Sequence, residues 1–236
     1  MIAAVVAAAF VLVGGGAYAV WRAQDASSPK PPAPSVTAGG GSSVGAGSVE
    51  PSATSSPSSG PSAEATAALQ SCVTQVRAQE SLAKAVGSAA ANWKTHTDAQ
   101  RRLEDGTYTA AQTAAAWARS KAKGPSDVKA YATANAGLKQ AGTGCADVGS
   151  KTAGSELESQ ATACAKRSEL LGAVASVGTK VQSQWSAHIT MMANKAHADR
   201  AAYHQRWLKM VKDAGPTLAE FDDAADAAAK APECSA

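Results

Sequence analysis

The residues of this sequence that could bind a metal ion are two histidines and a methionine. His96 and His188 each follow a tryptophan by three residues, Trp93 and Trp185 respectively. Met192 follows His188 by four residues, so the two side chains share one side of a helix. Imidazole nitrogen and thioether sulfur together suit copper. The spacing therefore predicts a copper site formed by His96, His188 and Met192, provided that the fold brings the two histidines together.

Other interpretations of these residues stay open. A histidine beside a core tryptophan is more often a buried hydrogen-bonding group, and methionine in an apolar stripe usually fills the core. The residue of the first copy that matches Met192 is Gln100, so a metal site would be asymmetric. Haem ligation is a further alternative, although a Cys-x-x-Cys-His attachment motif is absent. We therefore expect no cofactor, with copper as the alternative.

No motif of a known reaction class is present. The chain lacks a glycine-rich phosphate loop, a G-x-S-x-G elbow and the Glu-x-x-His pairs of di-iron bundles. The 22 basic and 19 acidic residues give a net charge of only +3, which provides no electrostatic footprint for nucleic acid. We therefore expect a protein that is not an enzyme and that has no nucleic-acid partner.

The histidines and tryptophans belong to an internal duplication. Cys72, Trp93 and His96 recur 92 residues later as Cys164, Trp185 and His188. Further matched pairs are Trp117 and Trp207, Gly124-Pro125 and Gly215-Pro216, Tyr131 and Phe221, and Cys145 and Cys234. The duplication divides a domain of residues 62–236 into two repeat units, 62–150 and 151–236.

Alanine-rich composition and apolar residues at helical spacing predict an all-α domain. In the first unit we expect a long helix from Ser62 to Glu104, ended by an acidic pair and Gly106. Thr109 is suited to cap the next helix. Gly124-Pro125 predicts a break before the last helix of the unit.

The second unit repeats this plan with one difference. Its long helix is expected to begin near Ser155 and to continue to about Met210, because apolar residues keep their helical spacing over this range. His197 and His204 fall on the opposite, solvated side of that helix. Gly215-Pro216 predicts a break before a short last helix.

The four cysteines fall at duplicated positions. In the first unit, a long helix followed by a broken helix of similar length returns the chain to its starting end, which would bring Cys72 near Cys145. The same argument joins Cys164 to Cys234 in the second unit. Four cysteines allow three pairings, and the duplication favours these two. The predicted fold is an antiparallel four-helix-bundle-like domain, made of two disulfide-closed hairpins related by a pseudo-two-fold axis.

The first 61 residues predict a membrane anchor and a tether. Residues 2–20 form an apolar run long enough to span a bilayer, so residues 1–24 are interpreted as an anchor. Ala17-Tyr18-Ala19 resembles a signal-peptidase site, which makes a cleaved signal peptide and a secreted product the alternative. Residues 25–61, rich in Ser, Pro and Gly, predict a disordered linker. An even number of cysteines in an exported chain favours an extracytoplasmic domain on a single-pass membrane protein.

An anchor, a Ser/Pro/Gly tether and an Ala-rich helical domain together resemble exported proteins of high-GC actinobacteria. The Trp-x-x-His motif followed by Met-Met is loosely similar to that of helical envelope proteins associated with copper. Our first hypothesis is a non-enzymatic, membrane-tethered module with an interaction or structural role toward an envelope or cell-wall partner. The second is a metal sensor or carrier that uses His96, His188 and Met192, and the third is an enzyme of unknown type.

Overall fold

The structure is a computed structural model that describes residues 60–194 and 199–235. The described residues form helices and no strand, so the predicted all-α class is confirmed. The helices are α2 (Ala63–Glu104), α3 (Ala110–Ala141), α4 (Val148–Thr152), α5 (Glu158–Ala193) and α6 (Arg200–Ala229). The predicted anchor, nearly all of the linker and His197 lie outside the described residues. No described helix is long and apolar enough to cross a membrane.

The ends of the first hairpin follow the predicted capping residues. Ser62 is the N-cap of α2, and its side chain accepts a hydrogen bond from the backbone N–H of Ala65. Thr109 caps α3 through a capping box with Gln112. Gly106 lies between the two helices with φ 75°, a left-handed conformation that glycine adopts without strain. These local signals set the position of the turn.

The predicted helix breaks at Gly124-Pro125 and Gly215-Pro216 are wrong. Pro125 lies inside α3 and Pro216 lies inside α6, and both helices continue past them. A proline ring usually clashes with the Cβ and N–H of the preceding residue, which disfavours helical geometry there. Glycine precedes the proline in both cases and has no Cβ, so part of this clash is absent and the helix can continue.

The predicted single helix from Ser155 to about Met210 is also wrong. The structure ends α5 at Ala193 and begins α6 at Arg200, so Met210 belongs to α6. Asp199 is the N-cap of α6 and accepts a hydrogen bond from the backbone N–H of Ala202. Apolar spacing that remains in phase from α5 to α6 concealed this boundary.

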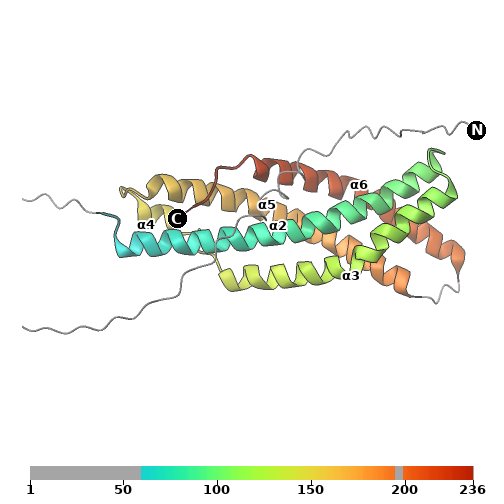
Figure 1. Cartoon of the computed structure of the whole chain (residues 1–236), viewed down its shortest axis with the longest axis horizontal. Helices are drawn as coiled ribbons and strands as arrows, with labels where there is room; N and C mark the ends of the chain where they lie inside the picture. The colour runs from blue at the N-terminus through green and yellow to red at the C-terminus, as the bar shows by residue number, and fades with distance from the viewer. Residues whose placement is uncertain (1–59, 195–198, 236) are drawn as a thin grey trace, which may run out of the picture. The chain divides into compact units, whose positions relative to one another are not determined.

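Within each unit the two long helices run antiparallel and a disulfide joins their open ends. The predicted bridges Cys72–Cys145 and Cys164–Cys234 are both confirmed. Asp127 of α3 accepts hydrogen bonds from Ser88 and Asn92 of α2, which fixes the middle of the first hairpin. Figure 1 shows the hairpin of α2 and α3 beside that of α5 and α6, with the short α4 between them in the chain.

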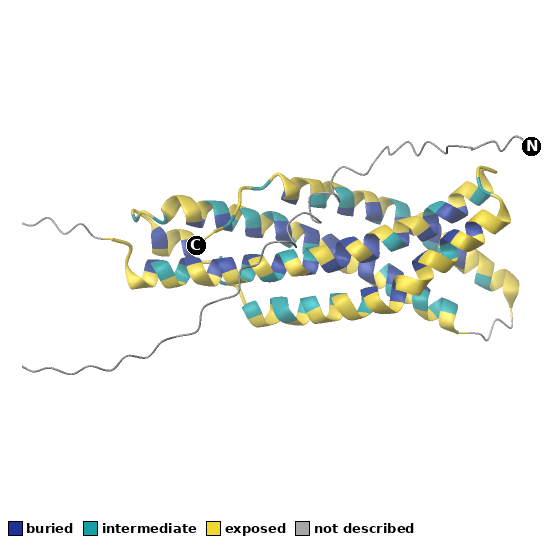
Figure 2. Ribbon diagram, in the orientation of Figure 1, coloured by how far each residue is buried: buried dark blue, intermediate teal, exposed yellow. Residues whose placement is uncertain are grey.

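Between the units, α2 packs along α5 in a parallel arrangement, with matched residues of the two repeats opposite each other. Trp93 lies against Trp185, with ring centroids 5.4 Å apart. Val86 likewise lies opposite Gly178. The buried side chains are concentrated along these two helices, whereas the second half of α3 is mostly exposed or partly exposed (Figure 2). The α2–α5 contact is therefore the core of the domain.

Gly178 allows the backbones of α2 and α5 to approach each other closely. A Cβ added there would lie 2.9 Å from both γ-carbons of Val86, and these stiff groups cannot rotate away. We therefore expect Gly178→Ala to lower the free energy of unfolding by about 1–3 kcal/mol. Urea denaturation followed by circular dichroism measures this change.

Two further variants test whether the loss comes from this contact. Gly137→Ala is the control, because Gly137 lies inside α3 with no atom within 4 Å of the added Cβ. It should raise stability by about 0.5–1 kcal/mol through helix propensity alone. Adding Val86→Ala to Gly178→Ala should recover part of the lost stability. Equal gains for Gly178→Ala and Gly137→Ala would refute the close contact.

Candidate functional site

The two repeat-matched histidines face each other in the interior of the domain. His96 of α2 and His188 of α5 are each only 2% exposed, and their Nε2 atoms lie 2.9 Å apart. Their burial follows from the α2–α5 contact, in which matched residues of the two repeats meet. The structure therefore brings together two of the three residues predicted from the sequence.

Four tryptophans, one from each long helix, surround the histidine pair. Trp207 lies nearest to His188, with ring centroids 4.5 Å apart, and Trp117 lies 5.8 Å from His96. Trp93 and Trp185 are fully buried beside them. The histidine pair therefore lies in a dry, aromatic environment.

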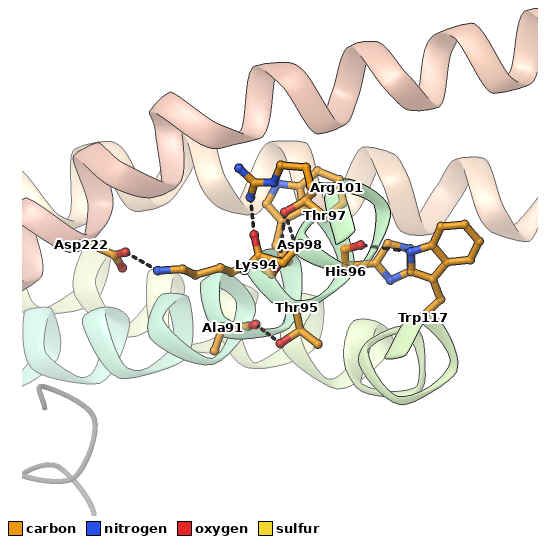
Figure 3. Close-up of polar contacts among 10 residues, drawn as sticks. Ala91, Lys94, Thr95, His96, Thr97, Asp98, Arg101, Trp117 and Asp222 are labelled. Atoms are coloured by element: carbon orange, nitrogen blue, oxygen red, sulfur yellow. Dashed lines mark hydrogen bonds and ion pairs between the residues drawn. The ribbon is translucent and has the colours of Figure 1, made fainter. Parts of the chain in front are cut away.

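Hydrogen bonds from all four indole N–H groups fix the tryptophan rings. The acceptors are Gln184 for Trp93 at 3.3 Å, the main-chain oxygen of His96 for Trp117 at 3.1 Å, Asp127 for Trp185 at 3.1 Å and Gln100 for Trp207 at 2.7 Å. Figure 3 shows the Trp117 bond, together with the ion pair of Lys94 with Asp222 that links α2 to α6. Each of these bonds joins different helices, so the cage is held by the whole bundle.

A chain of hydrogen bonds sets the tautomers of the histidine pair. The Ser120 hydroxyl lies 2.7 Å from His96 Nδ1 and donates its proton to the main-chain oxygen of Ala116. His96 Nδ1 must then donate to Ser120, which leaves the His96 Nε2 lone pair to accept from His188 Nε2. The buried Nδ1 of His188 has no hydrogen-bond partner. This assignment follows from the bonding network, and it leaves one imidazole nitrogen unsatisfied.

Both histidines are neutral at neutral pH. Burial lowers the pKa of His96 to about 3, with further lowering by the neighbouring His188 and by the positive charge of Lys121. Burial and Lys121 lower the pKa of His188 to about 4. A neutral imidazole retains one nitrogen lone pair. Neither histidine therefore has to lose a proton before it binds an electrophilic ligand at neutral pH.

A cavity of about 350 Å³ opens beside the histidine pair. The residues that line it are His96, Trp117, Ala118, Lys121, His188, Met192, Tyr203 and Trp207. Met192 thus borders the same cavity as both histidines, so the three residues predicted as metal ligands share one cavity. The third described histidine, His204, is exposed on α6, as the sequence indicated.

Sequence reasoning missed Ser120, Lys121 and Tyr203 as neighbours of the site. The missing information was the register of the α2–α3 hairpin. Residues of α2 and α3 that contact each other lie at about equal distances in the sequence on either side of Tyr108. Ser120 therefore meets His96, and Thr113 reaches the main chain of Ala99. The predicted turn at residues 105–109 includes this position. Pairing the residues that lie equally far before and after the turn would have placed Ser120 beside His96.

The hydrogen-bonded series of Ser120, His96 and His188 is arranged like the nucleophile, general base and orienting group of a hydrolase. Ser120 is 2% exposed and does not line the cavity, and its proton is committed to the carbonyl of Ala116. The serine therefore cannot meet a substrate in this cavity. The arrangement instead orients His96.

The donor set of the site differs from common metal centres. Among residues 60–194 and 199–235, no group of three or more His, Cys, Asp or Glu side chains is placed to hold a metal ion. A site here would have to combine the two imidazoles with a ligand of another kind. No family model matches the chain, and neither a curated protein nor a solved structure shows significant similarity to it.

The lowered pKa values predict loss of stability in mild acid. Both imidazoles take up protons near pH 6.5 in the unfolded chain, but only near pH 4 and 3 in the folded chain. Their contribution to stability should be complete above pH 6.5 and decrease as the pH falls toward 3. The two groups together give a slope of up to about 2.7 kcal/mol per pH unit.

Urea denaturation midpoints between pH 4 and 7.5 measure this slope. The double variant His96→Gln with His188→Gln should flatten the part of the slope that lies between pH 6.5 and 4. His204→Ala is the control and should keep that slope, because His204 is exposed. A wild-type slope no steeper than that of the double variant would contradict the prediction.

Proposed function

We propose that this protein is a non-enzymatic, membrane-tethered, extracytoplasmic helical module that presents the histidine cavity as a binding site. The observation that carries this proposal is the pair of disulfides, Cys72–Cys145 and Cys164–Cys234, which uses all four cysteines of the chain. Structural disulfides form in oxidising compartments outside the cytoplasm. Each bridge closes a loop of about seventy residues and contributes about 4 kcal/mol in the chain-entropy model.

The position of the cavity along the domain supports a display role. The chain enters the domain at Ser62, and Cys72 lies about 15 Å along α2 from that point at 1.5 Å per residue. His96 lies about 50 Å along the same helix. The disulfides therefore reinforce the end that a tether would pull, while the cavity lies toward the far end. Such a module would present its binding site to an envelope or cell-wall partner.

We further infer that the two units, 62–150 and 151–236, are duplicated hairpins of an antiparallel four-helix bundle with a pseudo-two-fold axis. The contacts between matched residues Trp93 and Trp185, and between His96 and His188, support this interpretation. Residues 2–20 serve as the membrane anchor in this proposal and residues 25–61 as the tether. Cleavage after Ala19, with release of the domain, is the alternative.

The non-enzymatic role is supported by the chemistry of the cavity. Among the described residues that line it there is no carboxylate, and its two histidines are neutral and hydrogen-bonded to each other. A cavity of about 350 Å³ with aromatic walls favours binding of a small ligand over acid–base chemistry.

Thiol labelling of the full chain in intact cells tests the compartment. After denaturation without reductant, a maleimide-linked polymer should label no cysteine, and after reduction it should label four. The control is Cys72→Ser with Cys145→Ser, which should take two labels after reduction and none before it. Labelling of wild-type protein without reductant would contradict an extracytoplasmic location.

Cell fractionation tests the anchor. We expect the full chain in the membrane fraction, and its helical domain should be degraded by protease added outside the cytoplasmic membrane. Deletion of residues 2–20 should leave the chain in the cytoplasm with reduced cysteines. Recovery of the wild-type domain from the medium, starting at Val20, would instead support the secreted alternative.

A further inference from the structure

The geometry points to a site for one soft monovalent cation, copper(I), held by the Nε2 atoms of His96 and His188 and by the sulfur of Met192. This assignment names the ligand of the cavity proposed above and depends on that cavity being a binding site. No other group of side chains in the described part of the chain combines two buried lone-pair donors with an adjacent soft donor and a cavity.

The distance between the two imidazoles already suits chelation. Nitrogen ligands lie about 2.0–2.1 Å from a first-row metal ion, so two of them on one ion are about 2.9 Å apart at a right angle and about 4 Å apart when linear. The Nε2 atoms of His96 and His188 are 2.9 Å apart. Side-chain rotations that separate them by about 0.6 Å would open the angle at the ion to about 120°, with both rings still in the tryptophan cage.

The hydrogen-bond network permits replacement of the shared proton by the ion. Ser120 accepts from His96 Nδ1, so the Nε2 lone pair of His96 is already directed to the site. Binding through His188 Nε2 requires the proton of His188 on Nδ1, which has no partner in the free protein either. One imidazole nitrogen, Nδ1 of His188, therefore lacks a hydrogen-bond partner both with and without the ion. The two Nε2 atoms, 2.9 Å apart inside the tryptophan cage, leave no room between them for the porphyrin of a haem.

The remaining groups select a soft, singly charged ion. Met192 supplies a thioether one helical turn after His188 and borders the same cavity. Thioether and imidazole ligands without a carboxylate favour copper(I) over zinc or magnesium. Lys121 also borders the cavity, and its positive charge penalises a divalent ion more than a monovalent one. Trp207 and Trp117 lie against the histidine rings and also line the cavity.

Anaerobic titration of the full chain, purified in detergent without a polyhistidine tag, tests the assignment. A chromogenic copper(I) chelator serves as competitor, and silver(I) serves as a redox-inert probe of the same class. We expect one ion per chain, quenching of tryptophan fluorescence with the same stoichiometry, and a higher melting temperature. The fluorescence readout reports on this site, because four of the five tryptophans surround it.

Two neighbouring methionines provide a matched pair of variants. Met192→Leu preserves volume and should leave the metal-free melting temperature nearly unchanged, while copper(I) affinity falls about tenfold or more. Met191→Leu is the control, because Met191 packs against the core and does not line the cavity. It should keep the wild-type affinity. His188→Gln should remove the fluorescence response to copper(I), and the methionine pair remains decisive if this variant folds poorly.

Three outcomes would overturn the copper(I) assignment. The first is the absence of a stoichiometric ion in the wild type. The second is equal affinity in wild type, Met191→Leu and Met192→Leu. The third is tighter binding of zinc(II) than of copper(I). None of these outcomes changes the thiol labelling or fractionation results, so failure of the metal assignment is distinguishable from failure of the proposed compartment and tether.

Discussion

The whole domain depends on the parallel contact between α2 and α5. Matched residues of the two repeats meet across this contact, so a residue of α2 faces the residue of α5 that lies 92 positions later in the sequence. Val86 faces Gly178, Trp93 faces Trp185 and His96 faces His188. Close packing here buries the largest side chains, and α3 and α6 then cover the outer faces of the two central helices. The disulfides hold each covering helix to its central partner at the end away from the histidines.

The same contact explains why two polar rings are tolerated in an aromatic core. A buried imidazole needs a partner, and the pseudo-symmetric arrangement gives each histidine the other one. Two protonated rings at this distance would repel each other in a dry environment, so the arrangement requires neutral histidines. The bonds of Trp207 to Gln100 and of Trp185 to Asp127 hold the surrounding helices in place. The site is therefore preorganised by the core and is not assembled from loops.

Local signals in the sequence were sufficient for much of this architecture. The helix start at Ser62, the cap at Thr109 and the cysteine pairing followed from capping chemistry and the duplication. The contact of His96 with His188 was only a condition of the predicted metal site, and the structure supplies it. The helix breaks at Pro125 and Pro216 were wrong because tertiary packing and a preceding glycine overrode a local preference. The end of α5 at Ala193 was missed because apolar periodicity continues beyond it into α6. The neighbours of the histidines, Ser120 among them, depended on the register between helices, which periodicity alone does not give.

The contact between matched residues also bears on the symmetry of the domain. If one hairpin paired with an identical copy through this surface, its one histidine would meet the same histidine of the copy across the two-fold axis. Such a dimer must place the same residue on both sides of the axis. In this single chain the matched positions can differ, as Val86 and Gly178 do across the contact, and as Gln100 and Met192 do in sequence. A covalent link between the two halves therefore permits each half to differ around a centre that a symmetric dimer has to keep identical.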